Sequence, residues 1–232
     1  MCKEKSECSH HHSCIRRVPI FQNLTDQEIE LLQSVTHSRG YERGDFVFRE
    51  AEQSESLFVL NQGLIKLSKV ADNGKEHIIR FLFPGDFFGQ FALLQDKKHY
   101  ANAEIIEPAV VCRIHRDDFK PLMEQNPAMT YRFLLAMSEL LQQADEWAGA
   151  LHLYEVERRL AKLLFYLQSK DSTVDNQFRL PAAKKELALI IGTTPETLSR
   201  KLAQFESQGI LSVNKRIVRI LDQETLSQLA GA

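Results

Sequence analysis

The sequence predicts an α+β fold in which an N-terminal antiparallel β-roll of the jelly-roll type is followed by one long helix and a C-terminal winged helix-turn-helix. Three observations predict this order. Short apolar runs separated by glycine turns fill residues 19–125, a heptad pattern fills residues 126–152, and three helical patterns and a hairpin pattern fill residues 153–232. Residues 1–18 form a segment rich in cysteine and histidine, so we expect four regions with these boundaries.

The composition is typical of a folded protein of one or two domains. The 232 residues are 44% hydrophobic and 26% charged, with a net charge of −2. No stretch reaches the ~18 apolar residues that a membrane-spanning helix needs, and the N-terminus carries charges and histidines in place of an apolar signal region. We therefore expect a cytoplasmic protein without a membrane partner, in a compartment where structural disulfides are uncommon.

The pattern of residues 19–125 predicts a β-rich domain. Apolar runs such as "SLFVLNQG", "LIKLSKV" and "AVVCRIH" alternate with turn signals at "NQG", "DNG" and "PGD". A short helix precedes them, because Thr25 and Glu28 form a capping-box pattern ahead of Ile29 and Leu32. Short strands with frequent turns indicate an antiparallel sandwich or barrel.

The middle of the chain predicts a dimerisation helix that begins near Pro127. Its apolar residues recur at spacings of four and three, as in the a/d seam of a coiled coil. The seam consists of Phe133, Met137, Leu140, Ala144, Trp147 and Leu151, with Leu141 beside it. The strict 3.5-residue period favours a partner helix and therefore a homodimer. The alternative, a helix that lies on the core of its own domain, remains open.

The C-terminal region predicts two helices joined by a "GTT" turn and followed by a hairpin whose tip is Asn214-Lys215. Thr193 or Thr194 can cap the second helix, and Pro195 suits its first position. One face of this helix is apolar and consists of Leu198, Leu202 and Phe205. The opposite face carries Glu196, Ser199, Arg200 and Ala203.

The polar face of this helix and a local charge surplus favour double-stranded DNA as a partner. From Arg179 to Arg219 the chain has eight Lys and Arg residues but only three acidic residues. Arg can donate in a fork to guanine, Glu can accept from cytosine, and Ser suits either. The candidate DNA-binding residues are Thr194, Glu196, Thr197, Ser199 and Arg200, with Lys201, Lys215 and Arg216 as phosphate contacts. A surface helix with ordinary charges is the alternative.

Three stretches, "PGDFFGQFALL" at 84–94, "ETLSRKLAQFESQGIL" at 196–211 and the closing "LSQLAG", resemble the CRP/FNR family of bacterial transcription regulators. The resemblance implies a cyclic-nucleotide-binding-like roll and a homodimeric regulator that is not an enzyme. It implies Glu196, Ser199 and Arg200 as the base readers of an inverted repeat of TTGAT-like half-sites. It also implies RNA polymerase as a partner, through a surface such as the roll loop at 72–76.

The resemblance does not imply cyclic AMP as the effector of this chain. Members of the family that bind cyclic AMP use a Glu for the ribose and an Arg-Ser pair for the phosphate. The matching residues here are Gln90 and Tyr100-Ala101, which leave the phosphodiester charge without a cation. Lys97 and Lys98 lie nearby in the sequence and could substitute for it in part.

The cysteines resemble those of the FNR branch of the family and imply an oxygen-labile [4Fe–4S] cluster. Cys112, in "VVCRI", matches the roll ligand, and Cys8 and Cys14 match two N-terminal ligands. The third departs, because the FNR spacing would need a cysteine at Lys5 and this chain offers Cys2. Four cysteines suffice for such a cluster. A disulfide between an N-terminal cysteine and Cys112, a zinc site that adds His10, His11 or His12, and no cofactor remain alternatives.

Two further expectations follow from the residues. FNR proteins keep an acidic residue in the dimer seam where this chain has Ala144, so we expect a dimer with or without a cofactor. Rival functions from other classes are a cupin-type metalloenzyme and a ligand-binding module without DNA. The roll lacks the His-x-His pattern of a cupin, and a ligand-binding module would leave the C-terminal reading helix without a use.

Overall fold

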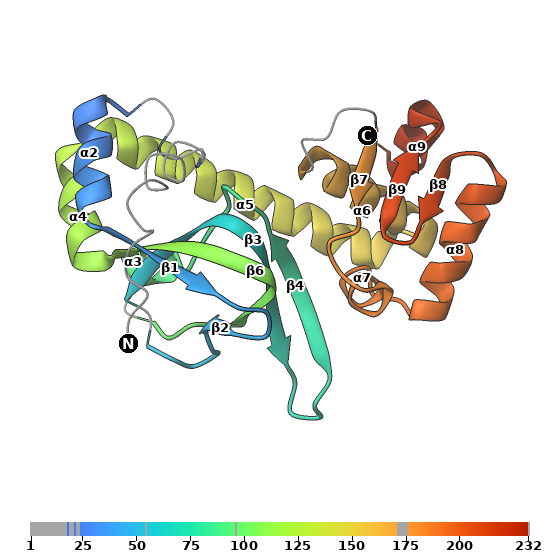
Figure 1. The fold of residues 1–232 in the computed structure, drawn as a ribbon, viewed down its shortest axis with the longest axis horizontal. Helices are drawn as coiled ribbons and strands as arrows, with labels where there is room; N and C mark the ends of the chain where they lie inside the picture. The colour runs from blue at the N-terminus through green and yellow to red at the C-terminus, as the bar shows by residue number, and fades with distance from the viewer. Residues whose placement is uncertain are drawn as a thin grey trace. The chain divides into compact units, whose positions relative to one another are not determined.

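The computed structural model describes residues 18, 21, 24–53, 55–95, 97–170 and 176–231. The chain divides into two compact units, Met1–Leu141 and Gln142–Ala232. Helix α5 (Pro127–Leu153) crosses the boundary between them, so the expected dimerisation helix is shared by the two units (Figure 1). Cys2, Cys8 and Cys14 and the three neighbouring histidines lie outside the described residues.

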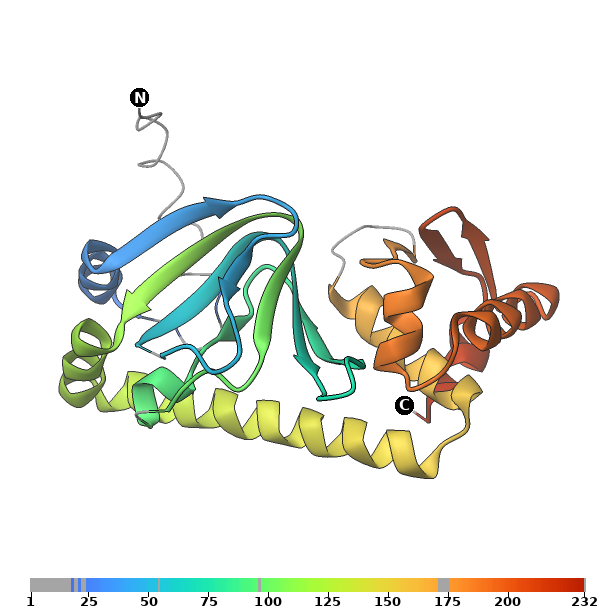
Figure 2. The ribbon, with the colours of Figure 1, turned by 90° about the horizontal axis from the view of Figure 1, so that it is seen from below.

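The first unit is the expected antiparallel β-roll, which confirms the predicted fold class (Figure 2). Its strands are β1 (Thr36–Tyr41), β2 (Phe46–Phe48), β3 (Ser56–Val70), β4 (Glu76–Leu82), β5 (Phe87–Phe88) and β6 (Asn102–His115). The sheet has the order β1-β6-β3-β4, with β2 added to β6 and β5 added to β3. The long strands β3 and β6 form its spine, and they pair over almost their full length.

Strands β3 and β6 bend together where Gly63 faces Pro108. Gly63 has φ +93°, and a Cβ at this position would overlap the carbonyl oxygen of Pro108. The register shifts on either side of Gly63 mark a bulge. The turn predicted at "NQG" is therefore wrong, because β3 continues through it and the glycine bends the strand beside a proline that has no N–H to donate.

Three helices cover the end of the roll from which β1 begins, and they share one apolar core with it. They are α2 (Asp26–Ser34), α4 (Arg116–Gln125) and the first half of α5, while the short α3 (Phe91–Leu94) follows β5. The core includes Ile29 and Leu32 of α2, Phe119 of α4, and Met129 and Phe133 of α5. The predicted capping box of α2 is confirmed by the bonds between Thr25 and Glu28.

The interior of the roll holds an aromatic cluster that encloses a histidine. His99 is 7% exposed and its ring stacks on Phe48 with centroids 3.5 Å apart and planes at 2°. Phe58 and Phe88 complete the cluster. The backbone of His99 is held by two bonds, one from the Ala51 N–H and one to the Glu52 carbonyl oxygen. Burial lowers the pKa of His99, against the opposing charge of Glu52.

A buried ion triad crosses the same sheet. The ammonium of Lys66 on β3 lies 2.8 Å from Glu76 and 2.8 Å from Glu104, while its side chain is only 6% exposed. Burial by itself would lower the pKa of Lys66, but its hydrogen bonds to Glu104 and Glu76 outweigh that effect and raise it. Removal of the lysine alone would leave two carboxylates facing each other, so the triad holds β4 and β6 to β3 only as a complete set.

The second unit is the expected winged helix-turn-helix. Its elements are α6 (Val156–Lys170), β7 (Gln177–Arg179), α7 (Lys184–Ile190), α8 (Pro195–Ser207), β8 (Leu211–Asn214), β9 (Ile217–Ile220) and α9 (Gln223–Ala230). The sheet has the order β7-β9-β8. The hairpin tip is Lys215-Arg216 and not Asn214-Lys215, because Asn214 pairs with Ile217 and Lys215 takes a left-handed φ of +56°. Among the described helices none is long and apolar enough to cross a bilayer.

Replacing His99 by phenylalanine should flatten the pH dependence of the roll's stability. Because the folded-state pKa of His99 lies below its ordinary value of 6.5, the stability that it contributes is fully present above that value and is lost as pH falls below it. Urea unfolding followed by circular dichroism, from about pH 8 to about pH 5, should show a steeper loss for wild type than for His99→Phe. Parallel pH profiles would contradict the burial of a neutral imidazole.

Candidate nucleic-acid interface

The start of α8 is built by a cap and a turn that the sequence specifies. Thr194 has extended backbone angles and its hydroxyl accepts from the Thr197 N–H at 3.2 Å, so Thr194 and not Thr193 is the cap. Pro195 occupies the first helical position. Gly192, with φ +63°, reverses the chain after α7. These features fix where α8 begins and therefore which residues reach its exposed N-terminal face.

The two faces of α8 separate as the pattern predicts. Leu198, Leu202 and Phe205 are buried, at 0%, 3% and 0% exposure. On the other side Glu196, Arg200 and Ala203 are exposed and Ser199 is half-buried. Thr194 is exposed, and Thr197 is half-buried beside it. The structure thus brings the predicted base-reading residues together on one surface near the start of the helix.

Two of the three predicted phosphate contacts are engaged inside the chain. The Lys201 ammonium lies 2.6 Å from Glu157 of α6 and also donates to Gln204. The Arg216 guanidinium donates to the backbone carbonyls of Leu180 and Pro181. These contacts assign both residues to holding the unit together. Lys215, by contrast, is exposed at the tip of the wing.

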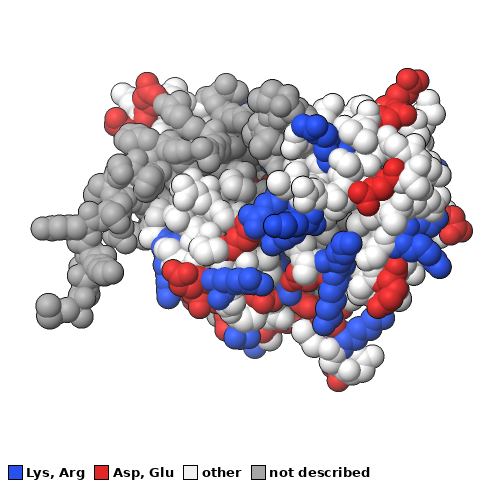
Figure 3. Space-filling view, turned by 45° about the vertical axis from the view of Figure 1, so that its right-hand side comes forward, with Lys and Arg blue, Asp and Glu red and all other residues white. Residues whose placement is uncertain are grey.

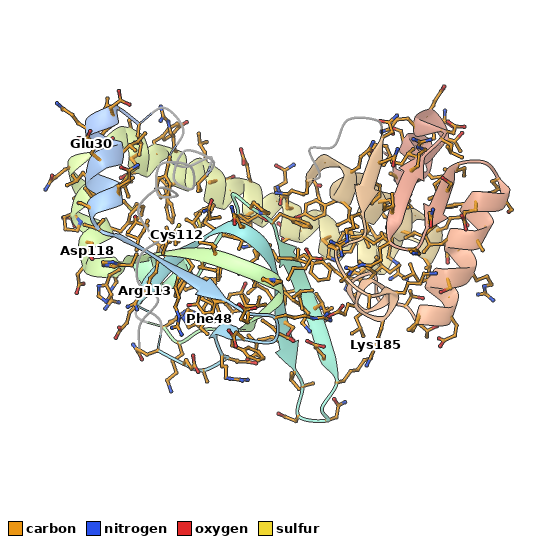
Figure 4. All side chains as sticks on the ribbon, in the orientation of Figure 1. Glu30, Phe48, Cys112, Arg113, Asp118 and Lys185 are labelled. Atoms are coloured by element: carbon orange, nitrogen blue, oxygen red, sulfur yellow. The ribbon has the colours of Figure 1, made fainter. Side chains whose placement is uncertain are left out.

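Two cations that sequence reasoning did not assign lie exposed at the start of α7. Lys184 and Lys185 are both exposed, and Lys185 points outward from the helix (Figure 4). Their signal was present in the basic surplus of the region. On the face shown in Figure 3, Lys and Arg side chains are interspersed with Asp and Glu. The choice of cations that could contact DNA phosphates therefore depends on individual positions more than on one large basic surface.

Helix α5 presents a different apolar surface from the predicted seam. Phe133 is 1% exposed and belongs to the core of the roll, and Met137 and Leu140 pack against that core. The expectation that Phe133 faces a partner chain is therefore wrong. Leu134 and Leu141 are 58% and 63% exposed. The first half of the helix thus lies on its own domain, as the open alternative had it.

Cys112, the only cysteine among the described residues, lies in the apolar core of the first unit. It sits on β6 beside β1 (Figure 4) and is 1% exposed. Its sulfur lies 3.3 Å from the Ser38 hydroxyl. Val18 and Phe21 belong to the same buried cluster. Because Cys14 precedes Val18 by four residues, extended chain would place it within about 14 Å of that residue.

Of the residues considered for a metal or a cyclic nucleotide, the structure describes Cys112, Gln90, Lys97, Lys98 and Tyr100-Ala101. The described residues include no group of three His, Cys, Asp or Glu side chains that could hold a metal ion. Tyr100 packs edge-on against Phe91 and Ala101 is buried. Lys97 and Lys98 are exposed.

Together these features are those of a DNA-binding regulator with a β-roll and a winged helix-turn-helix. Two family profiles match the chain: a cyclic nucleotide-binding domain over residues 38–126 and a Crp-like helix-turn-helix domain over residues 158–229. A relative from Lacticaseibacillus casei named "Probable transcriptional regulator flp" is 31% identical, over 94% of this chain and 99% of the relative. The chain belongs to the CRP/FNR family of transcription regulators.

Other relatives carry names that describe anaerobic regulation. The fumarate and nitrate reduction regulatory protein of Vibrio cholerae is 28% identical, over 97% of this chain and 89% of its own length. Among solved structures, FixK2 of Bradyrhizobium japonicum matches with a TM-score of 0.79 and 24% identity, over 85% of this chain and 98% of that one. The structural match supports the fold.

Proposed function

We propose that this protein is a redox-responsive transcription regulator that binds, as a homodimer, an inverted repeat of TTGAT-like half-sites. The observation that supports it best is the surface of α8, where Glu196, Ser199 and Arg200 lie together over a buried apolar anchor. Anaerobic regulators among its relatives support the redox part.

The reading helix supplies the contacts that such a site needs. Arg200 would donate to guanine O6 and N7, Glu196 would accept from cytosine N4, and Ser199 would adapt to its neighbours, each pair being worth about 1–3 kcal/mol of discrimination. Thr194 and Thr197 lie at the start of α8, beside the path of the DNA backbone. For phosphate contacts we favour Lys215, Lys184 and Lys185, because Lys201 and Arg216 already bind groups within the chain.

The homodimer would form on the exposed stripe of α5. Leu134, Leu141, Ala144 and Ala148 are exposed, and with half-buried Met137 they follow spacings of three and four residues. This stripe replaces the predicted seam while retaining Met137, Leu141 and Ala144 from it. Because Ala144 brings no charge to the stripe, we infer that the protein pairs with or without a cofactor. The switch would then act on the orientation of the two reading helices.

The sensor would be a [4Fe–4S] cluster held by Cys2, Cys8, Cys14 and Cys112. The described residues fit this iron–sulfur group, because Cys112 lies in one apolar core with Val18 and Phe21. Both of these residues follow the cysteine-rich segment closely in the chain. When bound, the cluster would supply sensitivity to oxygen. The part of the protein is to shield Cys112 from water and to place the Ser38 hydroxyl beside its sulfur. A disulfide and a zinc site use subsets of the same ligands and are outcomes of the test below.

The remaining partner would be RNA polymerase. The β3–β4 turn, residues 71–75, is exposed throughout and offers a surface for it. We propose no catalytic step for this protein, because its proposed task is to bind DNA, and the protein itself switches between two states.

Arg200→Ala should abolish selective DNA binding. Fluorescence anisotropy with an inverted TTGAT repeat and with an unrelated duplex should show at least a tenfold weaker specific complex, about 1.4 kcal/mol, and little change in non-specific affinity. The matched variant Lys215→Ala should weaken both complexes alike and reduce the salt dependence, since a phosphate contact carries no sequence information. Selective binding that survives in Arg200→Ala would refute the assignment of α8.

Leu141→Glu should dissociate the homodimer. Two symmetry-related glutamates would face each other in the stripe, and sedimentation should show at least about tenfold weaker association. Leu135→Glu is the matched control, because Leu135 is exposed on a neighbouring face of the same helix. A wild-type apoprotein that is monomeric at micromolar concentration would contradict the proposed apolar seam.

Protein purified without oxygen should absorb broadly near about 400 nm, bleach in air and contain about four irons per chain. Cys112→Ser should lose the iron, and so should Cys14→Ser. A colourless protein without iron would overturn the cluster. The zinc content of the same sample would then separate a zinc site from a disulfide, and the DNA-binding proposal would stand apart from either result.

A further inference from the structure

The junction between α5 and α6 is braced by one arginine of α6. Helix α5 ends at Leu153 and α6 begins at Val156. The guanidinium of Arg159 donates from Nη1 to the carbonyl oxygen of Leu151, at 3.3 Å. Leu151 lies in the last turn of α5, where carbonyl groups lack a partner within the helix. Arg159 therefore ties the start of α6 to the end of the helix before it.

The turn between α7 and α8 lies close to Arg159 and Leu151. A Cβ built on Gly192 would lie 3.3 Å from Nη1 of Arg159 and 3.3 Å from Cδ2 of Leu151. Gly192 precedes the cap of α8, Thr194, by two residues. One side chain thus contacts the end of α5 and the turn that sets the position of the reading helix, and all three segments belong to the same compact unit.

A contribution to folding stability does not by itself explain why residue 159 is an arginine. The Nε atom of Arg159 is buried and has no hydrogen-bond partner among the described residues. A buried donor without a partner disfavours the folded state. An apolar side chain would fill the same space without that cost, but it could not donate to the Leu151 carbonyl oxygen of α5.

We propose that Arg159 is a positioning residue that sets the orientation of α8 relative to the end of α5. The proposal rests on the homodimer and inverted repeat proposed above. If two α5 helices pair along their length, the brace in each subunit fixes the separation and angle of the two reading helices. It therefore determines which spacer between the two half-sites the dimer accepts. A change in the last turn of α5 would reach α8 through the same contact.

The test is a series of DNA duplexes in which two TTGAT half-sites are separated by spacers of different length, together with a duplex that carries one half-site. Wild-type protein should prefer one spacer at least about tenfold over spacers that are two base pairs longer or shorter. Arg159→Ala should bring the affinities for these spacers to within about twofold of each other, with half-site affinity unchanged. Lys170→Ala is the matched control, because it removes a cation from the other end of the same helix and should keep the wild-type preference.

Arg159→Met retains much of the length of the side chain but not the donor, and it provides a second variant should the alanine substitution fail to fold. It should lose spacer preference as well, because it cannot donate to the Leu151 carbonyl oxygen. Full spacer preference in either folded variant would overturn the proposal. So would a fall in half-site affinity that parallels a fall in thermal stability, because that pattern marks a structural residue. Failure of wild-type protein to bind the paired sites would overturn the proposed function itself.

Discussion

Helix α5 has two apolar faces: one lies in the core of the roll and the other is exposed. Much of the structure depends on which face of the helix is buried. Its first half buries Met129, Phe133 and Ala136 in the core of the roll, which fixes the rotation of the helix about its own axis. Leu134 and Leu141 are then left exposed on another face. The helix continues unbroken to Leu153. Burial of one face in the roll thereby limits which face of its first half a partner could use.

The roll is held together by three features that the sequence places far apart in the chain. The bend at Gly63 and Pro108 curves the two longest strands, and the triad of Lys66, Glu76 and Glu104 joins three neighbouring strands. His99 and its aromatic neighbours occupy the interior. The interior of the roll is thus filled by its own side chains, while Cys112 lies in a second apolar core together with Val18 and Phe21.

The C-terminal unit separates its cations into two roles. Lys201 and Arg216 bind Glu157 and backbone carbonyls, which joins α8 to α6 and the wing to the strand before α7. Lys184, Lys185, Arg200 and Lys215 stay exposed. Cations of both kinds look alike in a sequence. The number that can meet DNA is therefore smaller than the local surplus indicates, and each engaged cation makes the reading surface more rigid.

The sequence by itself determined the order of the elements and the two faces of α8, and it limited the cap of α8 to Thr193 or Thr194, because these features depend on residues within a few positions of one another. Only the tertiary structure decided that β3 continues through "NQG", that Lys201 and Arg216 bind groups within the chain, and that Phe133 is buried. In each case the deciding partner is distant in the chain: Pro108 for Gly63, Glu157 for Lys201 and the core of the roll for Phe133. A heptad period states that a helix has an apolar stripe, but the choice between its own domain and a second chain depends on which surface packs first.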